Sequence, residues 1–155
     1  MTLRQQYQAY ASATQTVAKT RQIVMLYDAA IRYIQQGKEA IREKRIEDRY
    51  NVLVKAGEII FGLQSCLDFE NGKDIARILY SFYSSIDNRL FTIHRTNNIE
   101  LCDELIADLK QMREVWNDID QNAPTDANAV VPAPSAPANI APEGSSPDQT
   151  VSLSA

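Results

Sequence analysis

The sequence predicts an all-α protein whose main domain is an antiparallel, up-and-down four-helix bundle. Apolar residues recur at intervals of three and four, and no stretch shows the alternation of a half-buried strand. No proline precedes Pro124 in the 155 residues, so nothing breaks a helix over most of the chain. Short breaks in the apolar pattern divide this stretch into four runs, and short connections favour antiparallel neighbours.

The first two helices of this bundle are separated by a turn of four consecutive charges, Arg42 to Arg45. The apolar spacing of the first helix continues to Ile41, and its phase slips before the next apolar residue, Ile46. The second helix begins there. We expect it to end at Asn71-Gly72, a pair that stops helices and forms turns.

The third predicted helix begins at Asp74, whose carboxylate suits an N-cap, and ends between Arg95 and Asn98. The fourth carries apolar residues at helical spacing from Cys102 to Ile119 with no helix breaker inside it. The four helices together define a bundle domain over residues 17–121.

Two flanking segments differ from the bundle in composition. Residues 1–16 are rich in Gln, Ala and Thr, and we interpret them as a flexible, loosely held N-terminal arm. Residues 122–155 contain all six prolines, with Ala, Ser and three acids but no Lys or Arg. Such a segment buries too little apolar surface to offset its ordering entropy, so we expect a disordered C-terminal tail.

Charge and composition exclude several classes of protein. Residues 1–123 carry 16 basic and 17 acidic residues in dispersed positions, which argues against a nucleic-acid partner. No run approaches a membrane span, and the N-terminus lacks the apolar segment of a signal peptide. Cys66 and Cys102 lie within apolar helical patterns, which favours buried free thiols over a disulfide. We therefore expect a protein of the cytosol.

The residues offer little catalytic or metal-binding chemistry. The single histidine, His94, lies near the end of the third helix, where a surface or capping role is the simpler interpretation. One histidine cannot supply the paired motifs of a dimetal bundle site, and no glycine-rich phosphate loop follows a strand. We expect no enzyme activity, no metal and no cofactor.

The amount of apolar helix surface is unusual. On a helical wheel the apolar residues between Leu53 and Leu67 span roughly 240°, more than a surface helix needs. Tyr80 and Phe91 lie outside the main stripe of the third helix. Gly57 and Gly62, each costing about 1 kcal/mol relative to Ala, permit close packing within the bundle or close approach by a partner helix. This surplus predicts a binding groove.

Specific residues resemble a known family. They are a Tyr-containing arm, an apolar run around Met-Leu-Tyr-Asp, a Lys-Ala-x-x-Ile-Ile run and scattered aromatic positions in the later helices. They comprise Tyr7, Ala9-Tyr10, Val24 to Ile34, Leu53 to Ala56, Ile59-Ile60, Leu67-Asp68, Glu70, Gly72, Tyr80, Tyr83, Arg89-Leu90 and Trp116. In this order and spacing they resemble the FliS family of flagellin-specific export chaperones.

The resemblance implies a cytosolic helical chaperone that binds the C-terminal segment of flagellin, prevents its premature polymerisation and assists its export through the flagellar type III secretion system. A flagellar export-gate protein is a second implied partner, and the chaperone is a monomer or weak dimer. We assign the flagellin-binding groove to seven apolar residues: Ile23, Leu26, Tyr27, Ile60, Leu63, Tyr83 and Leu90. Tyr7 and Tyr10 match a movable N-terminal lid in the family.

Two other functions fit the same pattern. A self-associating helical interaction module would cover its apolar surface with a second copy, and sedimentation would detect that dimer. An adaptor would sequester another helical client, such as an anti-sigma factor. For the chaperone, replacing Tyr27 and Ile60 by Asp is predicted to abolish binding of the flagellin segment.

Overall fold

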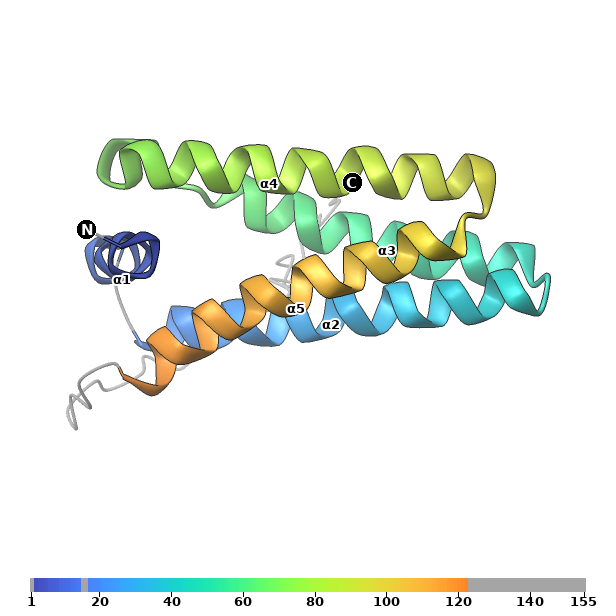
Figure 1. Cartoon of the computed structure of the whole chain (residues 1–155), viewed down its shortest axis with the longest axis horizontal. Coiled ribbons are helices and arrows are strands. Elements are labelled where there is room, and N and C mark those ends of the chain that lie inside the picture. The colour runs from blue at the N-terminus through green and yellow to red at the C-terminus, as the bar shows by residue number, and fades with distance from the viewer. Residues whose placement is uncertain (1, 15–16, 123–155) are drawn as a thin grey trace, which may run out of the picture. The chain divides into compact units, whose positions relative to one another are not determined.

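The computed structural model describes residues 2–14 and 17–122, and the side chains of residues 2–8 and 19–122. This part of the chain contains five helices and no strand, which confirms the predicted all-α fold (Figure 1). The helices are α1 (Leu3–Thr14), α2 (Val17–Arg42), α3 (Ile46–Ser65), α4 (Phe69–Thr96) and α5 (Ile99–Gln121). Helices α2 to α5 are the four helices of the predicted bundle.

The bundle is built around α2, which packs against α3 on one side and α5 on the other, while α4 packs against α3 (Figure 1). The largest fully buried side chains come from all four helices: Tyr27, Ile34, Leu53, Ile60, Leu79, Tyr83, Ile86, Ile93, Cys102, Leu105, Leu109 and Trp116. They follow the apolar spacing of the sequence, because each helix turns one stripe toward its neighbours.

One glycine accounts for the close contact of α2 with α3. A Cβ atom added to Gly37 would lie 2.6 Å from Cδ2 of Leu53, closer than side-chain atoms pack. Gly37 therefore lets the Leu53 side chain lie directly against the α2 backbone.

Ion pairs join α5 to α2 and α4 at several positions along its length. Arg113 on α5 donates to both carboxylate oxygens of Asp28 on α2, at 2.9 and 3.2 Å. Lys38 on α2 pairs with Asp103 near the start of α5, and Arg89 on α4 lies 2.8 Å from Asp108. Because all are partly exposed, they specify the alignment of the helices more than they add stability.

The turn between α2 and α3 confirms the predicted boundary at the four charges. Lys44 adopts a left-handed conformation with φ 58°, and its N–H donates to the carbonyl of Ile41. The N–H of Arg45 donates to the carbonyl of Ala40 at 2.8 Å. This pair of bonds is a Schellman motif, with a lysine where glycine is usual.

The boundary between α3 and α4 differs from the prediction. Helix α3 ends at Ser65, and α4 begins at Phe69, so Asn71-Gly72 lies inside α4 rather than ending the second helix. Asp68 caps α4 by accepting from the N–H groups of Glu70 and Asn71, both at 3.0 Å, whereas Asp74 had been predicted to do so. The turn signal still marks an irregularity, because Lys73 has non-helical angles (φ 42°, ψ −116°) that kink the helix.

Helix α1 occupies part of the segment interpreted as a loosely held arm. Its Tyr7 side chain is 3% exposed and meets the ring of Trp116 on α5 edge-on, with ring centroids 6.4 Å apart. Arg4 pairs with Asp118 of α5 at 3.2 Å. Among the described side chains of α1, Tyr7 is therefore the buried anchor, and the helix packs against α4 as well as α5. The predicted tail, from residue 123 onward, lies outside the described residues.

Candidate functional site

The described surface keeps many large apolar side chains exposed. They lie on α1 to α4 and are Leu3, Met25, Leu26, Ile46, Tyr50, Phe61, Phe69, Ile78, Tyr80 and Phe91. Phe61 is 66% exposed and Phe91 63% exposed, and both belong to the helices in which the sequence shows surplus apolar surface. The predicted surplus is confirmed at these positions, and exposed apolar surface of this kind indicates an interaction site.

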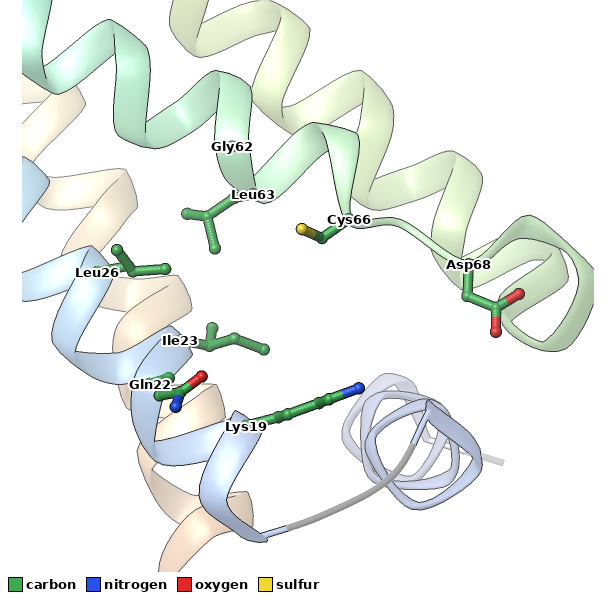
Figure 2. A pocket seen from close by; sticks show the side chains of 8 residues that line it. All are labelled: Lys19, Gln22, Ile23, Leu26, Gly62, Leu63, Cys66 and Asp68. Carbon is green, nitrogen blue, oxygen red and sulfur yellow. The ribbon is translucent and has the colours of Figure 1, made fainter. Parts of the chain in front are cut away.

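A pocket of about 400 Å³ lies between the first turns of α2 and the end of α3 (Figure 2). Ile23 and Leu26 of α2 face Leu63 of α3 across it, and these three side chains form its apolar walls. Gly62, Cys66 and three polar residues, Lys19, Gln22 and Asp68, complete the lining. The pocket is therefore apolar at its centre and polar at its rim, which suits an amphipathic partner.

Helical geometry explains how these residues come together. Ile23 and Leu26 are three apart on α2, so they share one face of that helix. Asp68 is held at the rim by its capping role at the start of α4. Hydrogen bonds from Asn71, and then from the backbone N–H of Glu70, hold the pKa of the Asp68 carboxyl below its ordinary value of 3.8. Asp68 therefore contributes a fixed negative charge to a rim that also carries the positive charge of Lys19.

The seven predicted groove residues divide into two groups. Ile23, Leu26 and Leu63 line the pocket, although Leu63 is only 7% exposed and also belongs to the core. The other four, Tyr27, Ile60, Tyr83 and Leu90, are 0 to 4% exposed and belong to the core. The structure therefore does not bring these four to an accessible groove, because their stripes face the neighbouring helices. Replacing Tyr27 and Ile60 by Asp would test folding rather than binding.

Four lining residues were not predicted by sequence reasoning: Lys19, Gln22, Cys66 and Asp68. The polar side chains of Lys19, Gln22 and Asp68 give no signal in a hydrophobic pattern, and Cys66 fitted the apolar pattern without being distinguished from the core. Gly62 had been noted as unusual in a helix, and it is the sequence feature that pointed toward this wall. Cys66 is exposed, contrary to the expectation of a buried thiol, because α3 ends beside it.

A buried aromatic cluster lies beneath the predicted N-terminal lid. The hydroxyls of Tyr27 and Tyr83 are 2.7 Å apart, and burial, followed by the effect of Tyr83, raises the pKa of Tyr27 well above 10.0. The neighbouring Trp116 lowers the pKa of Tyr27 in part, and Tyr7 of α1 packs on the same tryptophan. The side chain of Tyr10, the other predicted lid residue, lies outside the described residues.

His94 and Cys102 show no arrangement for catalysis. His94 is half-buried against the ring of Tyr50, with centroids 5.6 Å apart, and desolvation and the charge of Arg49 lower its pKa. Burial raises the pKa of the Cys102 thiol to about 11, and both cysteines are free. Over residues 2–14 and 17–122, no group of three or more His, Cys, Asp or Glu is placed to hold a metal ion.

In the part of the chain that the structure describes, no helix is both long and apolar enough to cross a bilayer.

Comparison with known proteins relates these features to a family. The family model described as "Flagellar protein FliS" matches residues 3–123. The flagellar secretion chaperone FliS of Vibrio cholerae is 32% identical over 97 residues, which cover 63% of this chain and 71% of that protein. FliS of Campylobacter jejuni is 27% identical over 117 residues, covering 75% and 91%. FliSB of Pseudomonas aeruginosa is 29% identical over 99 residues, covering 64% and 79%. The chain belongs to the FliS family of flagellar secretion chaperones.

Proposed function

We propose that this protein is a cytoplasmic, non-enzymatic chaperone for flagellin. It binds the C-terminal segment of newly made flagellin, prevents premature polymerisation and assists export through the flagellar type III secretion system. The observation that carries the proposal is the pocket between α2 and α3, whose apolar walls lie open in a member of a flagellar secretion chaperone family. A flagellar export-gate protein is the second partner in this proposal.

Binding by this surface needs no covalent chemistry. An amphipathic helix lays its apolar face against the walls formed by Ile23, Leu26 and Leu63, and water leaves both surfaces. Each Å² of apolar area covered contributes about 25 cal/mol. Ordering of the client opposes this gain, so affinity depends on the fit as well as the area.

The pocket is too small to cover a whole amphipathic segment. A volume of about 400 Å³ is at the lower end of the range for small-ligand pockets, so it suits a few anchoring side chains. Exposed aromatic residues elsewhere on the bundle, Phe61, Tyr80 and Phe91, provide further apolar surface. The client in this proposal therefore extends beyond the pocket along the bundle.

Co-purification with flagellin tests the proposal. The chaperone should retain full-length flagellin and lose flagellin that lacks its C-terminal segment. In calorimetry with the isolated segment, Leu26→Asp should weaken binding at least tenfold, because it places a charge on the pocket wall (about 1.4 kcal/mol per tenfold). Leu26 is 40% exposed, so the variant should fold.

The matched control is the preceding residue. Met25 is 63% exposed and does not line the pocket, so Met25→Asp should weaken binding much less than Leu26→Asp does. Equal retention of truncated and full-length flagellin would show that the C-terminal segment is not the client.

A further inference from the structure

Three glycines lie within α2 and α3, and the structure explains them differently. Gly37 is needed by the fold, because an added Cβ would lie 2.6 Å from the Leu53 side chain. Gly62 is not needed by any described residue, because an added Cβ would meet nothing within 4 Å. No glycine among the described residues has a positive φ, so Gly62 is not required by its backbone angles either. A glycine that the fold does not use destabilises a helix interior relative to alanine.

The position of Gly62 suits contact with a binding partner rather than packing within the chain. Gly62 lies on the α3 wall of the pocket beside Leu63, and Ile23 and Leu26 face this wall from α2 (Figure 2). It is exposed to solvent. Where a side chain is missing from a helix surface, the backbone of a second helix can approach more closely and make more van der Waals contact.

The rim of the same pocket indicates the charge of the occupant. Lys19 lines the pocket, and its ammonium group has no ion-pair or hydrogen-bond partner among the described residues. The negative rim residue, Asp68, is instead engaged by the N–H groups at the start of α4. An acidic side chain on the occupant would complement Lys19.

We propose that Gly62 determines client specificity by admitting the backbone of a helical segment of flagellin at close range. The occupant carries a small residue where it crosses Gly62, apolar residues toward Leu26 and Leu63, and an acidic residue toward Lys19. This inference rests on the proposed function, since it assigns the pocket to the flagellin C-terminal segment.

Substitutions in α3 test this role of Gly62 with an internal control. Gly62→Ala should raise the melting temperature by a few degrees, through helix propensity, and weaken binding of the flagellin C-terminal peptide about fivefold. Gly62→Leu should weaken it at least fiftyfold, because overpacking grows with side-chain size. Stability and affinity thus change in opposite directions, which a purely structural role would not produce.

Gly57→Ala is the matched control. Gly57 lies in the same helix, its added Cβ would meet only Cδ1 of Leu90 at an ordinary 4.0 Å, and it does not line the pocket. The variant should gain similar stability and bind the peptide within twofold of the unchanged chain. Equal losses of affinity in Gly57→Ala and Gly62→Ala would overturn the assignment to the pocket.

Two further outcomes distinguish the role of Gly62 from the proposed flagellin-binding function. If the unchanged chain binds the peptide and Gly62→Ala binds it equally well, Gly62 has no role in specificity, while the proposed function stands. If the unchanged chain does not bind the peptide, the proposed function itself is wrong. Lys19→Gln should reduce the salt dependence of the affinity, and an unchanged dependence would remove the acidic residue from the proposed occupant.

Discussion

The buried pair of tyrosines makes a prediction about pH. Burial and the neighbouring Tyr83 raise the pKa of Tyr27 above its ordinary 10.0, so in the folded protein this hydroxyl keeps its proton longer than in the unfolded chain. The contribution of Tyr27 to the free energy of unfolding is therefore fully present below about pH 10. It falls as the pH rises further, by up to ~1.4 kcal/mol per pH unit. Urea unfolding at pH 8 to 11 measures this slope, and Tyr27→Phe should make it shallower. Equal slopes would contradict the assignment.

Single residues also show where prediction from the sequence stops. Leu26 and Tyr27 are adjacent and both fit an apolar stripe, yet one lines the pocket and the other is fully buried. A helical pattern gives the direction of a side chain about the axis, but it does not say where neighbouring helices end. Core and pocket residues therefore look alike in the sequence, and polar lining residues such as Lys19 give no apolar signal.

At the scale of elements, the end of α2 predicts a stabilising substitution. Lys44 occupies the left-handed position of the Schellman motif, where a Cβ atom is strained. Lys44→Gly should raise the free energy of unfolding by ~0.5–1 kcal/mol, the relief of strain less the entropy of glycine in the unfolded chain. Thermal unfolding measures the change. Lys44→Ala keeps the Cβ and removes the charge, so it should leave stability nearly unchanged; equal gains in both variants would point to charge instead.

Helix boundaries were predictable where local chemistry acts alone. Four charges without an apolar face ended α2 as expected, and Asn97-Asn98 separates α4 from α5, with Asn97 left-handed and Asn98 as the N-cap. Asn71-Gly72 did not end α3, because Asp68 captures two backbone N–H groups first and opens α4 with a short helical stretch, but the break at Lys73 leaves the longer stretch of α4 starting next to the predicted Asp74. The turn-forming residues Asn71-Gly72 are instead followed by the kink at Lys73 inside α4. Competing caps of similar strength cannot be ranked from sequence alone.

At the scale of the whole described chain, the four bundle helices were predictable because one periodicity runs through each of them. The attachment of α1 was not, because it depends on contacts with α4 and α5, such as Tyr7 with Trp116, that are far away in sequence. The sequence predicted that apolar surface would be left exposed, since a four-helix bundle does not bury an apolar arc as wide as the one between Leu53 and Leu67. Its division between core, pocket and exposed aromatic residues required the packing of α2 with α3.

The attachment of α1 gives the last prediction, which concerns the proposed lid. Among the described side chains of α1, Tyr7 supplies the buried contact, while the Arg4–Asp118 pair is exposed and contributes little. Tyr7→Ala should therefore release α1 from α5, expose Trp116 to water and shift its fluorescence to longer wavelength. Trp116 is the one tryptophan in the sequence, so the signal is unambiguous. If α1 is a lid that covers part of the client surface beyond the pocket, the affinity for the flagellin segment should rise severalfold, because the client no longer competes with Tyr7.

Arg4→Ala is the control, since it removes the exposed ion pair and leaves Tyr7 in place; fluorescence and affinity should both stay close to those of the unchanged chain. The two readouts in Tyr7→Ala separate the possible roles of this side chain. A red shift with weaker binding would mean that Tyr7 contacts the client directly and is not a lid. An unchanged spectrum would mean that contacts other than Tyr7 hold α1 against Trp116. Only a red shift together with tighter binding fits a helix that must leave its site before flagellin is bound.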